Sequence, residues 1–451
     1  MINVNSVINK IKSKARNNSG ILPKSGLFHF DYQENGERSR IHLRMDPDGS
    51  GLLLINASRI LHLNPTAVLL TYMILQNTNR DQSIGILTKT FDVSPDQASN
   101  DYTHIADQLH ELIKPDSACP IHDLNLEIIP PFSSQPSAPY RMDLAITYRC
   151  NNDCSHCYNA RSRDYPELAT KKWHQILDML WDIGIPHIIF TGGEPTLRED
   201  LPELIAHAEQ NGQITGINTN GRRLSDSKYV DSLVNAGLDH VQITLESHKP
   251  DIHDSMVNTP GAWKQTTAGI RNVLETSLYV MTNTTMLTDN SPMLKETLEF
   301  LAGIGVPTIG LNALIYSGRG LSVNTGIAER ELPSLLNIAR EVTSNYSQRL
   351  IWYTPTQYCN FDPMQLELGV KGCTAAMYNM CIEPNGDVIP CQSYYSSLGN
   401  ILITPWPNIW SHELSINLRE RNNVPEKCSV CSLVTECGGG CPLVMKTKGI
   451  I

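Results

Sequence analysis

The middle of the chain alternates between two hydrophobic periods. From residue 140 to residue 347, short apolar runs of strand length are each followed by a stretch whose apolar positions recur at helical spacing. The apolar runs are DLAITY, HIIFT, ITGIN, HVQITLE, LYVMTNTTM and TIGLNALIY. These six strand–helix units predict a parallel sheet with right-handed crossovers, either an open doubly wound sheet or a partial barrel. In both folds the chemistry belongs at the carboxyl ends of the strands.

The segment at 27–114 has a different order of elements. Three apolar runs, LFHFDY, SRIHLRM and GSGLLLIN, have strand character and come first. Asn64 and Pro65 then open a helix, and Asp81 and Ser94 are positioned to cap two more. Strands followed by three helices predict a winged-helix-like α+β module.

The remaining segments lack a regular alternation. Residues 1–26 are polar and are expected to form a solvated tail. Residues 115–139 contain six prolines, which suits an extended linker. Residues 348–451 consist of short pieces between cysteines, so we expect a metal-organised extension after the core at 140–347.

The 451 residues carry a formal net charge of −10. This balance argues against nucleic acid or an anionic membrane as the main partner. No apolar run reaches the length of about 18 residues that a transmembrane helix needs. The first residues also lack the apolar core of a secretory signal, so we expect a cytoplasmic protein.

The twelve cysteines are unevenly distributed. In a reducing cytosol they are poor candidates for structural disulfides and better candidates for metal ligands or catalytic thiols. Cys119 stands alone, Cys150, Cys154 and Cys157 form one group, and the other eight lie within 359–441. Such grouping is typical of metal sites rather than of thiols used as core filler.

The first group of cysteines falls in the loop after the first core strand. Three thiolates this close in sequence could hold a four-iron cluster, which normally takes four cysteines. One iron would then stay open to a ligand that is not protein. A zinc site is the alternative, although structural zinc prefers four protein ligands, and unrelated thiols are a third reading.

The motif RCNNDCSHCYN resembles the signature of the radical S-adenosylmethionine (SAM) enzymes, with His156 at a position that is usually aromatic. FTGGEPTL, one strand–helix unit later, resembles the SAM-binding turn of the same family. The resemblance implies a partial (β/α)6 TIM-like barrel and a 4Fe-4S cluster on Cys150, Cys154 and Cys157, whose open iron chelates SAM. In this family, SAM is cleaved to methionine and a 5′-deoxyadenosyl radical, which takes a hydrogen from the substrate.

Further segments resemble parts of the SAM pocket. INTNG, ITLESHKPDIHD and SGRG follow the third, fourth and sixth strands. Glu246 stands where relatives usually have an aspartate, whose side chain is one methylene shorter. By resemblance, the expected SAM contacts are Gly192, Gly193, Glu194, Pro195, Asn218, Thr244, Glu246 and Arg319. No residue stands out as a general acid or base.

The later cysteines resemble the SPASM extension of radical SAM peptide and protein maturases. Their pattern is Cys373-x12-Gly386-x4-Cys391, then Cys428-x2-Cys431-x5-Cys437-x3-Cys441. The resemblance implies one or two auxiliary 4Fe-4S clusters. The first would be held by Cys373, Cys391 and Cys441, with Cys381 as the candidate fourth ligand, and the second would begin with Cys428, Cys431 and Cys437. The last ligand of the second cluster stays open between a non-cysteine group, Cys359, an unliganded iron and loss of the cluster.

HLNPTAVLLTYMIL, with strands before it and helices after it, resembles the PqqD-type recognition element for ribosomally made, modified peptides (RiPPs). The resemblance implies that residues 27–114 bind a leader peptide as an extra strand. A DNA-binding winged helix is the rival interpretation, which the negative net charge of the chain disfavours.

Together these motifs predict a radical SAM/SPASM oxidoreductase that modifies a precursor peptide. The expected reactions are thioether or carbon–carbon crosslinking, or oxidative decarboxylation, with a flavodoxin- or ferredoxin-type electron donor. Two alternatives stay open. One is maturation of a folded protein or a small cofactor precursor, and the other is a non-enzymatic iron–sulfur or zinc scaffold.

Overall fold

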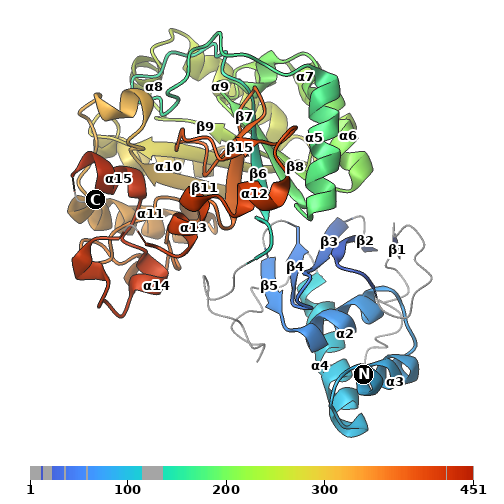
Figure 1. The fold of residues 1–451 in the computed structure, drawn as a ribbon. Helices are drawn as coiled ribbons and strands as arrows, with labels where there is room; N and C mark the ends of the chain where they lie inside the picture. The colour runs from blue at the N-terminus through green and yellow to red at the C-terminus, as the bar shows by residue number, and fades with distance from the viewer. Residues whose placement is uncertain are drawn as a thin grey trace. The chain divides into compact units, whose positions relative to one another are not determined.

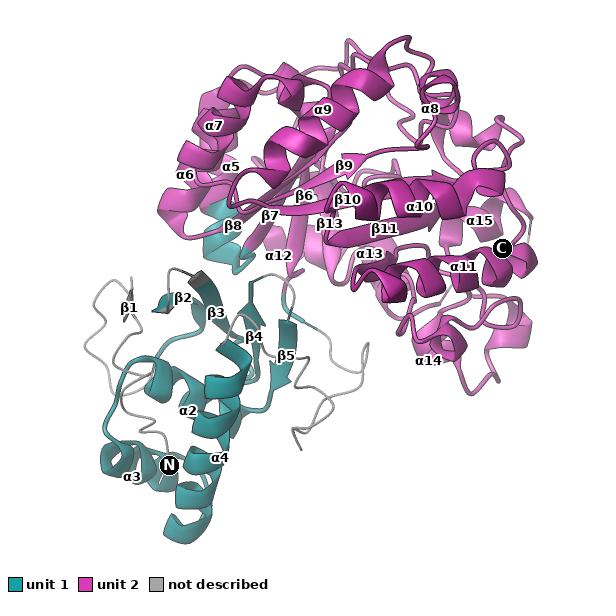
Figure 2. Cartoon of the chain, turned by 180° about the vertical axis from the view of Figure 1, so that it is seen from behind, with its two compact units in different colours: residues 1–137, 179–186 teal, residues 138–178, 187–451 magenta. Residues whose placement is uncertain are grey.

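The computed structural model describes residues 12–13, 23–34, 37–56, 59–113, 136–422 and 424–449. The chain forms two compact units, coloured separately in Figure 2. Unit 1 comprises residues 1–137 and 179–186, and unit 2 comprises residues 138–178 and 187–451. Cys119 and most of the predicted tail and linker lie outside the described residues.

Unit 1 contains an antiparallel sheet whose strands follow one another in chain order. They are β1 (Lys12–Ser13), β2 (Gly26–Glu34), β3 (Glu37–Met45), β4 (Gly51–Ile55) and β5 (Arg59–Leu63). Three helices follow: α2 (Pro65–Leu75), α3 (Arg80–Thr90) and α4 (Pro95–Ile113). Apolar side chains of this sheet and of all three helices share one core. The predicted strands and helices are present, and β5 is an additional strand.

The helix caps of unit 1 follow the sequence in two of three places. The Asn64 side chain accepts a hydrogen bond from the Ala67 N–H at 2.9 Å, and the Ser94 hydroxyl accepts one from the Gln97 N–H at 3.2 Å. The predicted cap at Asp81 is wrong. Asn79 caps α3 instead, because its side chain accepts from the Asp81 N–H at 2.9 Å and leaves Asp81 inside the first turn.

Unit 2 is built on a parallel sheet whose strands also follow chain order. The strands are β6 (Arg141–Thr147), β7 (His187–Gly192), β8 (Ile214–Thr219), β9 (His240–Thr244), β10 (Tyr279–Met286), β11 (Thr308–Ala313) and β12 (Arg349–Trp352). The main connecting helices are α5 (Thr170–Ile183), α6 (Leu201–Asn211), α7 (Ser227–Asn235), α9 (Ala262–Leu274), α10 (Leu294–Gly303) and α11 (Leu332–Asn345). These helices lie along the outer face of the curved sheet (Figure 1).

This strand order decides between the two predicted architectures. A doubly wound sheet reverses its order at a switch point, whereas the strands from β6 to β12 run in one direction without reversal. The partial TIM-like barrel is therefore confirmed. The structure also adds β12, which pairs in parallel with β11 within the segment that was expected to lack this alternation.

The C-terminal extension continues the same sheet past β6. Strand β13 (Asn379–Ile382) pairs in parallel with β6, and β14 (Asp387–Ile389) and β15 (Gly399–Asn400) follow as antiparallel strands. Four short helices complete it: α12 (Trp406–Trp410), α13 (Glu413–Arg419), α14 (Val434–Cys437) and α15 (Pro442–Thr447). The extension and the barrel thus share main-chain hydrogen bonds.

In the described part of the chain, no helix combines the length and apolar character that crossing a membrane requires.

A buried carboxylate strengthens the junction between the barrel and the extension. Glu383, after β13, is fully buried and accepts two hydrogen bonds from the Arg161 guanidinium, at 2.6 and 2.8 Å. It also accepts one from the Tyr148 hydroxyl at 3.1 Å. The Arg161 side chain is 30% exposed, so water screens part of the interaction.

We expect the Glu383→Gln variant to lose about 2–4 kcal/mol of unfolding free energy, because one partner of a largely buried ion pair is neutralised. Denaturant unfolding under anaerobic conditions measures this loss. Glu299→Gln is the control, since Glu299 forms only an exposed pair with Lys295 at 3.9 Å and should change stability by less than about 0.5 kcal/mol. Equal losses in both variants would contradict a structural role for Glu383.

Candidate active site

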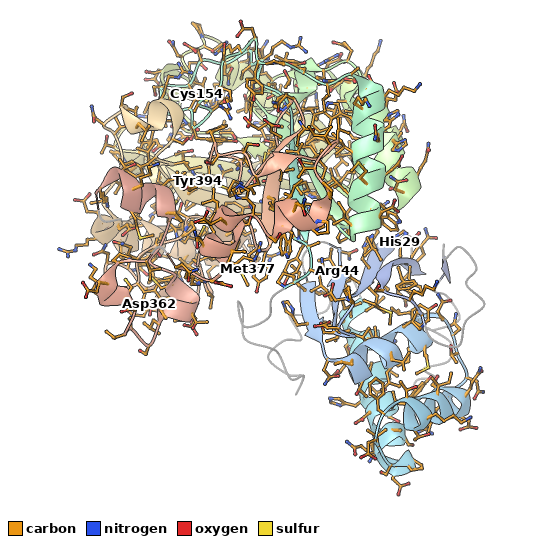
Figure 3. The ribbon with its side chains drawn as sticks, in the orientation of Figure 1. His29, Arg44, Cys154, Asp362, Met377 and Tyr394 are labelled. Carbon is orange, nitrogen blue, oxygen red and sulfur yellow. The ribbon has the colours of Figure 1, made fainter. Side chains whose placement is uncertain are left out.

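The first group of cysteines lies in the loop that begins where β6 ends. Cys150, Cys154 and Cys157 occupy this loop, and Cys154 is labelled in Figure 3. The Cys157 N–H donates to the Cys154 carbonyl at 3.3 Å, and the Asn152 N–H donates to the Cys150 sulfur at 3.4 Å. These bonds fold the loop back on itself, so the three thiols gather at the carboxyl edge of the sheet.

The thiols of this loop are costly to ionise without a metal. Burial raises the pKa of Cys150 to about 11, and the nearby Glu194 carboxylate adds to the shift. Burial also raises the pKa of Cys154 well above its ordinary value, with further contributions from Cys157 and Cys150. A metal group that binds thiolates must overcome this cost, so its binding releases protons and stabilises the loop.

The donor set fits an iron–sulfur cluster. Among the described residues, no three Cys, His, Asp or Glu side chains are arranged to hold a single metal ion. A four-iron cluster takes one thiolate on each iron, so its ligands lie further apart than those of a single ion. Cys150, Cys154 and Cys157 could hold such a cluster on three of its irons.

Three arginines hold the cysteine loop from outside. Arg163 donates to the carbonyls of Cys150 and Asn152 at 3.0 and 2.6 Å. The Arg222 guanidinium donates to the Asn152 side chain at 3.0 Å. The main-chain N–H of Arg319 donates to the Cys157 carbonyl at 2.9 Å. Their positive charges favour a loop that carries thiolates. No sequence motif pointed to a role for Arg163 or Arg222 at this loop, although Arg222 directly follows the INTNG segment.

The GGEP turn packs against the backbone that leads to the cysteine loop. The Gly193 N–H donates to the Thr147 carbonyl and the Glu194 N–H donates to the Arg149 carbonyl, both at 2.8 Å. A Cβ atom on Gly193 would lie 2.6 Å from the Tyr148 carbonyl oxygen and closer still to that of Arg149. Only glycine therefore fits here, and the turn is fixed beside the first cysteine.

The Glu194 carboxylate is engaged inside the protein. It accepts hydrogen bonds from the Thr196 N–H at 3.1 Å, from the Thr196 and Thr219 hydroxyls at 2.6 Å, and from the Asn220 N–H at 2.8 Å. Burial raises the pKa of Glu194, and these donors oppose the shift. Glu194 thus ties η2 (Pro195–Leu197) to the end of β8, and the backbone of the turn is the part that could meet a cofactor.

Two unusual residues of the sequence contact one another. His156 Nε2 lies 3.0 Å from Glu246 Oε1, and the other Glu246 oxygen accepts the Thr285 N–H at 2.9 Å. Burial alone would lower the pKa of His156, but Glu246 outweighs it and raises that pKa above its ordinary value. The longer glutamate thus pairs with the histidine that stands at the usually aromatic position.

The other predicted cofactor contacts lie at the same edge. Asn218 on β8 and Thr244 on β9 are half-buried on neighbouring strands. Arg319, after β11, donates from its guanidinium to Asp153 at 2.9 Å. The structure therefore brings the loops after β6, β7, β8, β9 and β11 together, as expected for the carboxyl ends of parallel strands.

The cysteines of the extension form two further groups. Burial raises the pKa of Cys373, and the thiolates of Cys441 and Cys391 contribute, so these three lie near one another. Burial likewise raises the pKa of Cys391 to about 12. Cys381 is buried on β13, and the Cys391 thiolate is among the groups that raise its pKa, after burial and Asp143.

The second group of the extension lies on a turn before α14. The Cys431 N–H donates to the Cys428 carbonyl at 3.1 Å, and Cys437 ends α14. Burial raises the pKa of Cys428, with Cys437 and Cys431 among the contributing thiols. The assignment of these two groups as auxiliary-cluster ligands stays a prediction from the SPASM resemblance.

Comparison with protein families gives two matches. Residues 144–312 match the radical SAM superfamily, and residues 373–432 match the SPASM iron–sulfur cluster-binding domain. The first match includes the cysteine loop and the GGEP turn. The second includes five cysteines of the extension: Cys373, Cys381, Cys391, Cys428 and Cys431.

Curated relatives match about two thirds of the chain. An AdoMet-dependent heme synthase of Oleidesulfovibrio alaskensis is 27% identical over 312 residues, which are 65% of this chain and 80% of the relative. An Fe-coproporphyrin III synthase of Methanosarcina barkeri is 27% identical over 325 residues, 65% of this chain and 81% of the relative.

Solved structures extend the likeness of fold. Streptococcus suis SuiB bound to its precursor peptide SuiA has a TM-score of 0.67 at 16% identity, covering 90% of this chain and 95% of SuiB. SuiB bound to S-adenosylmethionine gives a TM-score of 0.68 over the same shares. The structure of anSMEcpe with bound AdoMet gives 0.54 at 16% identity, covering 68% of this chain and 91% of the other.

Proposed function

We propose that this radical SAM and SPASM enzyme modifies a ribosomally made precursor peptide, whose leader it binds through unit 1. One observation carries the proposal. The likeness to peptide-bound SuiB extends over 90% of the chain, whereas the curated synthases match 65% of it. The likeness to SuiB is longer than unit 2, so it includes part of the fold of unit 1, and the SuiB structure contains a precursor peptide.

Unit 1 and the barrel would divide the work between recognition and chemistry. The clusters and SAM supply one-electron cleavage of SAM and a 5′-deoxyadenosyl radical when they are bound. Cys150, Cys154 and Cys157 would hold the first cluster. The backbone of the GGEP turn would receive the amino group of SAM, and Arg319 would receive its carboxylate.

The protein's own side chains would mainly position and shield the site. Arg163, Arg222 and Arg319 hold the cysteine loop, and Glu194 locks the turn beside it. The auxiliary cysteines would hold groups that accept an electron from the substrate. This favours oxidative outcomes, such as a thioether or carbon–carbon crosslink or an oxidative decarboxylation, with flavodoxin or ferredoxin as electron donor.

The leader peptide would add a strand at β5. In the described residues this strand is one of the two outer strands of the sheet, β1 being the other, and its Ile60 side chain is 37% exposed. An extended peptide gains main-chain hydrogen bonds at such an edge, and exposed apolar side chains give it specificity.

We expect Ile60→Glu to weaken leader binding by at least about 10-fold, because 1.4 kcal/mol of lost apolar contact corresponds to tenfold in affinity. Fluorescence anisotropy of a labelled precursor peptide, encoded near the gene, measures this under anaerobic conditions. Ile338→Glu on α11 is the matched control, since Ile338 is 36% exposed and belongs to unit 2. Equal affinity in both variants would exclude β5 as the binding edge.

A second candidate is oxidative decarboxylation of a tetrapyrrole cofactor precursor, which the heme and coproporphyrin synthases favour. The two candidates are separated by incubating the reduced enzyme and SAM with either a precursor peptide or an iron porphyrin carboxylate. Mass spectrometry then reports which one changes. Loss of two hydrogens from the peptide supports the proposal, whereas loss of carbon dioxide from the porphyrin alone would refute it. Because the relatives are named as synthases, the non-enzymatic scaffold is set aside.

A further inference from the structure

We propose that Cys359 completes the ligand set of the second auxiliary cluster, together with Cys428, Cys431 and Cys437. The inference depends on one part of the proposed function, namely that the C-terminal extension holds a second auxiliary cluster. It assigns the fourth ligand to a residue that precedes the extension's other cysteines, in the connection between β12 and η7 (Pro363–Leu366).

The backbone before Cys359 is fastened to Cys437. The Tyr358 N–H donates to the Cys437 sulfur at 3.4 Å, and the Cys437 thiol lies 3.6 Å from the Thr356 carbonyl oxygen that accepts from it. The Gln357 side chain donates to the Gly439 carbonyl at 3.2 Å. Cys359 is the next residue along the chain after Tyr358, so its backbone lies close to Cys437.

The glycine run after Cys437 allows this close approach. Gly438, Gly439 and Gly440 all have positive φ, between 59° and 84°. A Cβ on Gly440 would lie 3.0 Å from the Gln357 side chain and 3.2 Å from the backbone nitrogen of Gln357. The CGGGC turn can therefore lie flat against the segment that ends at Cys359.

The position of Cys359 is also fixed from its other side. The Asn360 and Phe361 N–H groups donate to the Gln357 carbonyl at 2.8 and 3.0 Å, which closes a turn around Cys359. The Asn360 side chain donates to Glu329 at 2.9 Å. A thiol on a turn held in this way is preorganised to bind a metal group.

The Cys428 thiol lies within electrostatic reach of the other three thiols. After burial, the thiolates of Cys437, Cys359 and Cys431 all contribute to the raised pKa of Cys428. Cys359 and Cys431 are exposed and Cys437 is buried, so the four sulfurs extend from the interior to the surface. Four thiolates are the normal ligand set of a four-iron cluster.

A cluster completed in this way has no iron left for substrate. It would transfer electrons and would not bind a substrate thiolate directly. It would also join the end of β12 to the extension through its ligands.

The test uses full-length protein purified without oxygen. We expect Cys359→Ser and Cys437→Ser to cause the same change in the Mössbauer and EPR spectra, and each to lose up to about a third of the iron of a three-cluster protein. Ser334→Ala is the control, because Ser334 is exposed on α11 and has no thiol, and it should keep the wild-type spectra.

Two outcomes overturn the inference while leaving the proposed function intact. One is a Cys359→Ser protein that keeps the full iron content and the wild-type spectra, while the Cys437→Ser protein has lost iron and its spectra have changed. The other, which does not depend on a variant folding, is rapid alkylation of Cys359 by iodoacetamide in the wild-type holoprotein, since a cluster-bound thiolate should react only after iron is removed. Failure of the proposed function would instead appear as a wild-type protein that leaves the precursor peptide unchanged.

Discussion

Replacing Cys154 by alanine should abolish the formation of 5′-deoxyadenosine from SAM and dithionite. Burial raises the pKa of this thiol, and the neighbouring thiolates add to the shift, so its ionised form depends on a bound metal group. Loss of one of three ligands should cost more than about 100-fold in rate, since changes in residues that only support metal ligands already cost 10–100-fold. Anaerobic assays with separation of 5′-deoxyadenosine measure the effect.

Ser334→Ala, at an exposed position on α11, serves as the control for Cys154→Ala and should cleave SAM at the wild-type rate. A Cys154→Ala protein that still releases 5′-deoxyadenosine would remove the cysteine loop from the reaction.

Replacing Gly193 by alanine should prevent SAM binding while the first cluster stays in place. The new methyl group would meet the carbonyl oxygens of Tyr148 and Arg149, which are backbone atoms and cannot move aside cheaply. The GGEP turn must then shift away from the cysteine loop, and a shift of about 1 Å can cost 100-fold in rate. Equilibrium dialysis with labelled SAM, together with iron analysis, separates lost cofactor binding from lost cluster.

Gly303→Ala is the matched control, because an added Cβ at this position in α10 has no atom within 4 Å. It should bind SAM normally and be slightly more stable, since alanine favours a helix over glycine. If Gly193→Ala bound SAM as tightly as Gly303→Ala, the turn would have no part in cofactor binding.

The sequence predicted the barrel well because its signals are local. Each strand from β6 to β11 is an apolar run with a helix after it, and each of these two patterns can be recognised within its own segment of the chain. By contrast, β12 has only four residues, and no helical unit follows it to mark it as part of the sheet. Strand β5 alternates apolar residues with Arg59 and His62 and is similarly short. Asp81 was mistaken for a cap because Asn79, two residues earlier, offers the same chemistry.

The same distinction applies to the site. The cysteine loop and the GGEP turn are compact motifs, so their residues could be named in advance. The contact between His156 and Glu246 joins residues from different loops, and only the folded sheet brings them together. Arg163 and Arg222 bind carbonyl groups and a side-chain amide of the cysteine loop. Such contacts leave no characteristic spacing of residues in the sequence. The identity of the substrate stays a prediction, because none of these motifs specifies it.

The central claim is that three thiolates leave one iron open and that SAM binds there. Electron–nuclear double resonance on the reduced wild-type protein, with SAM labelled in its amino and carboxylate groups, tests this most directly. We expect magnetic coupling between the labels and the cluster in the wild-type protein, and we expect this coupling to be absent from the Cys154→Ala protein. No coupling with the cluster fully loaded, or zinc in place of iron on Cys150, Cys154 and Cys157, would contradict it.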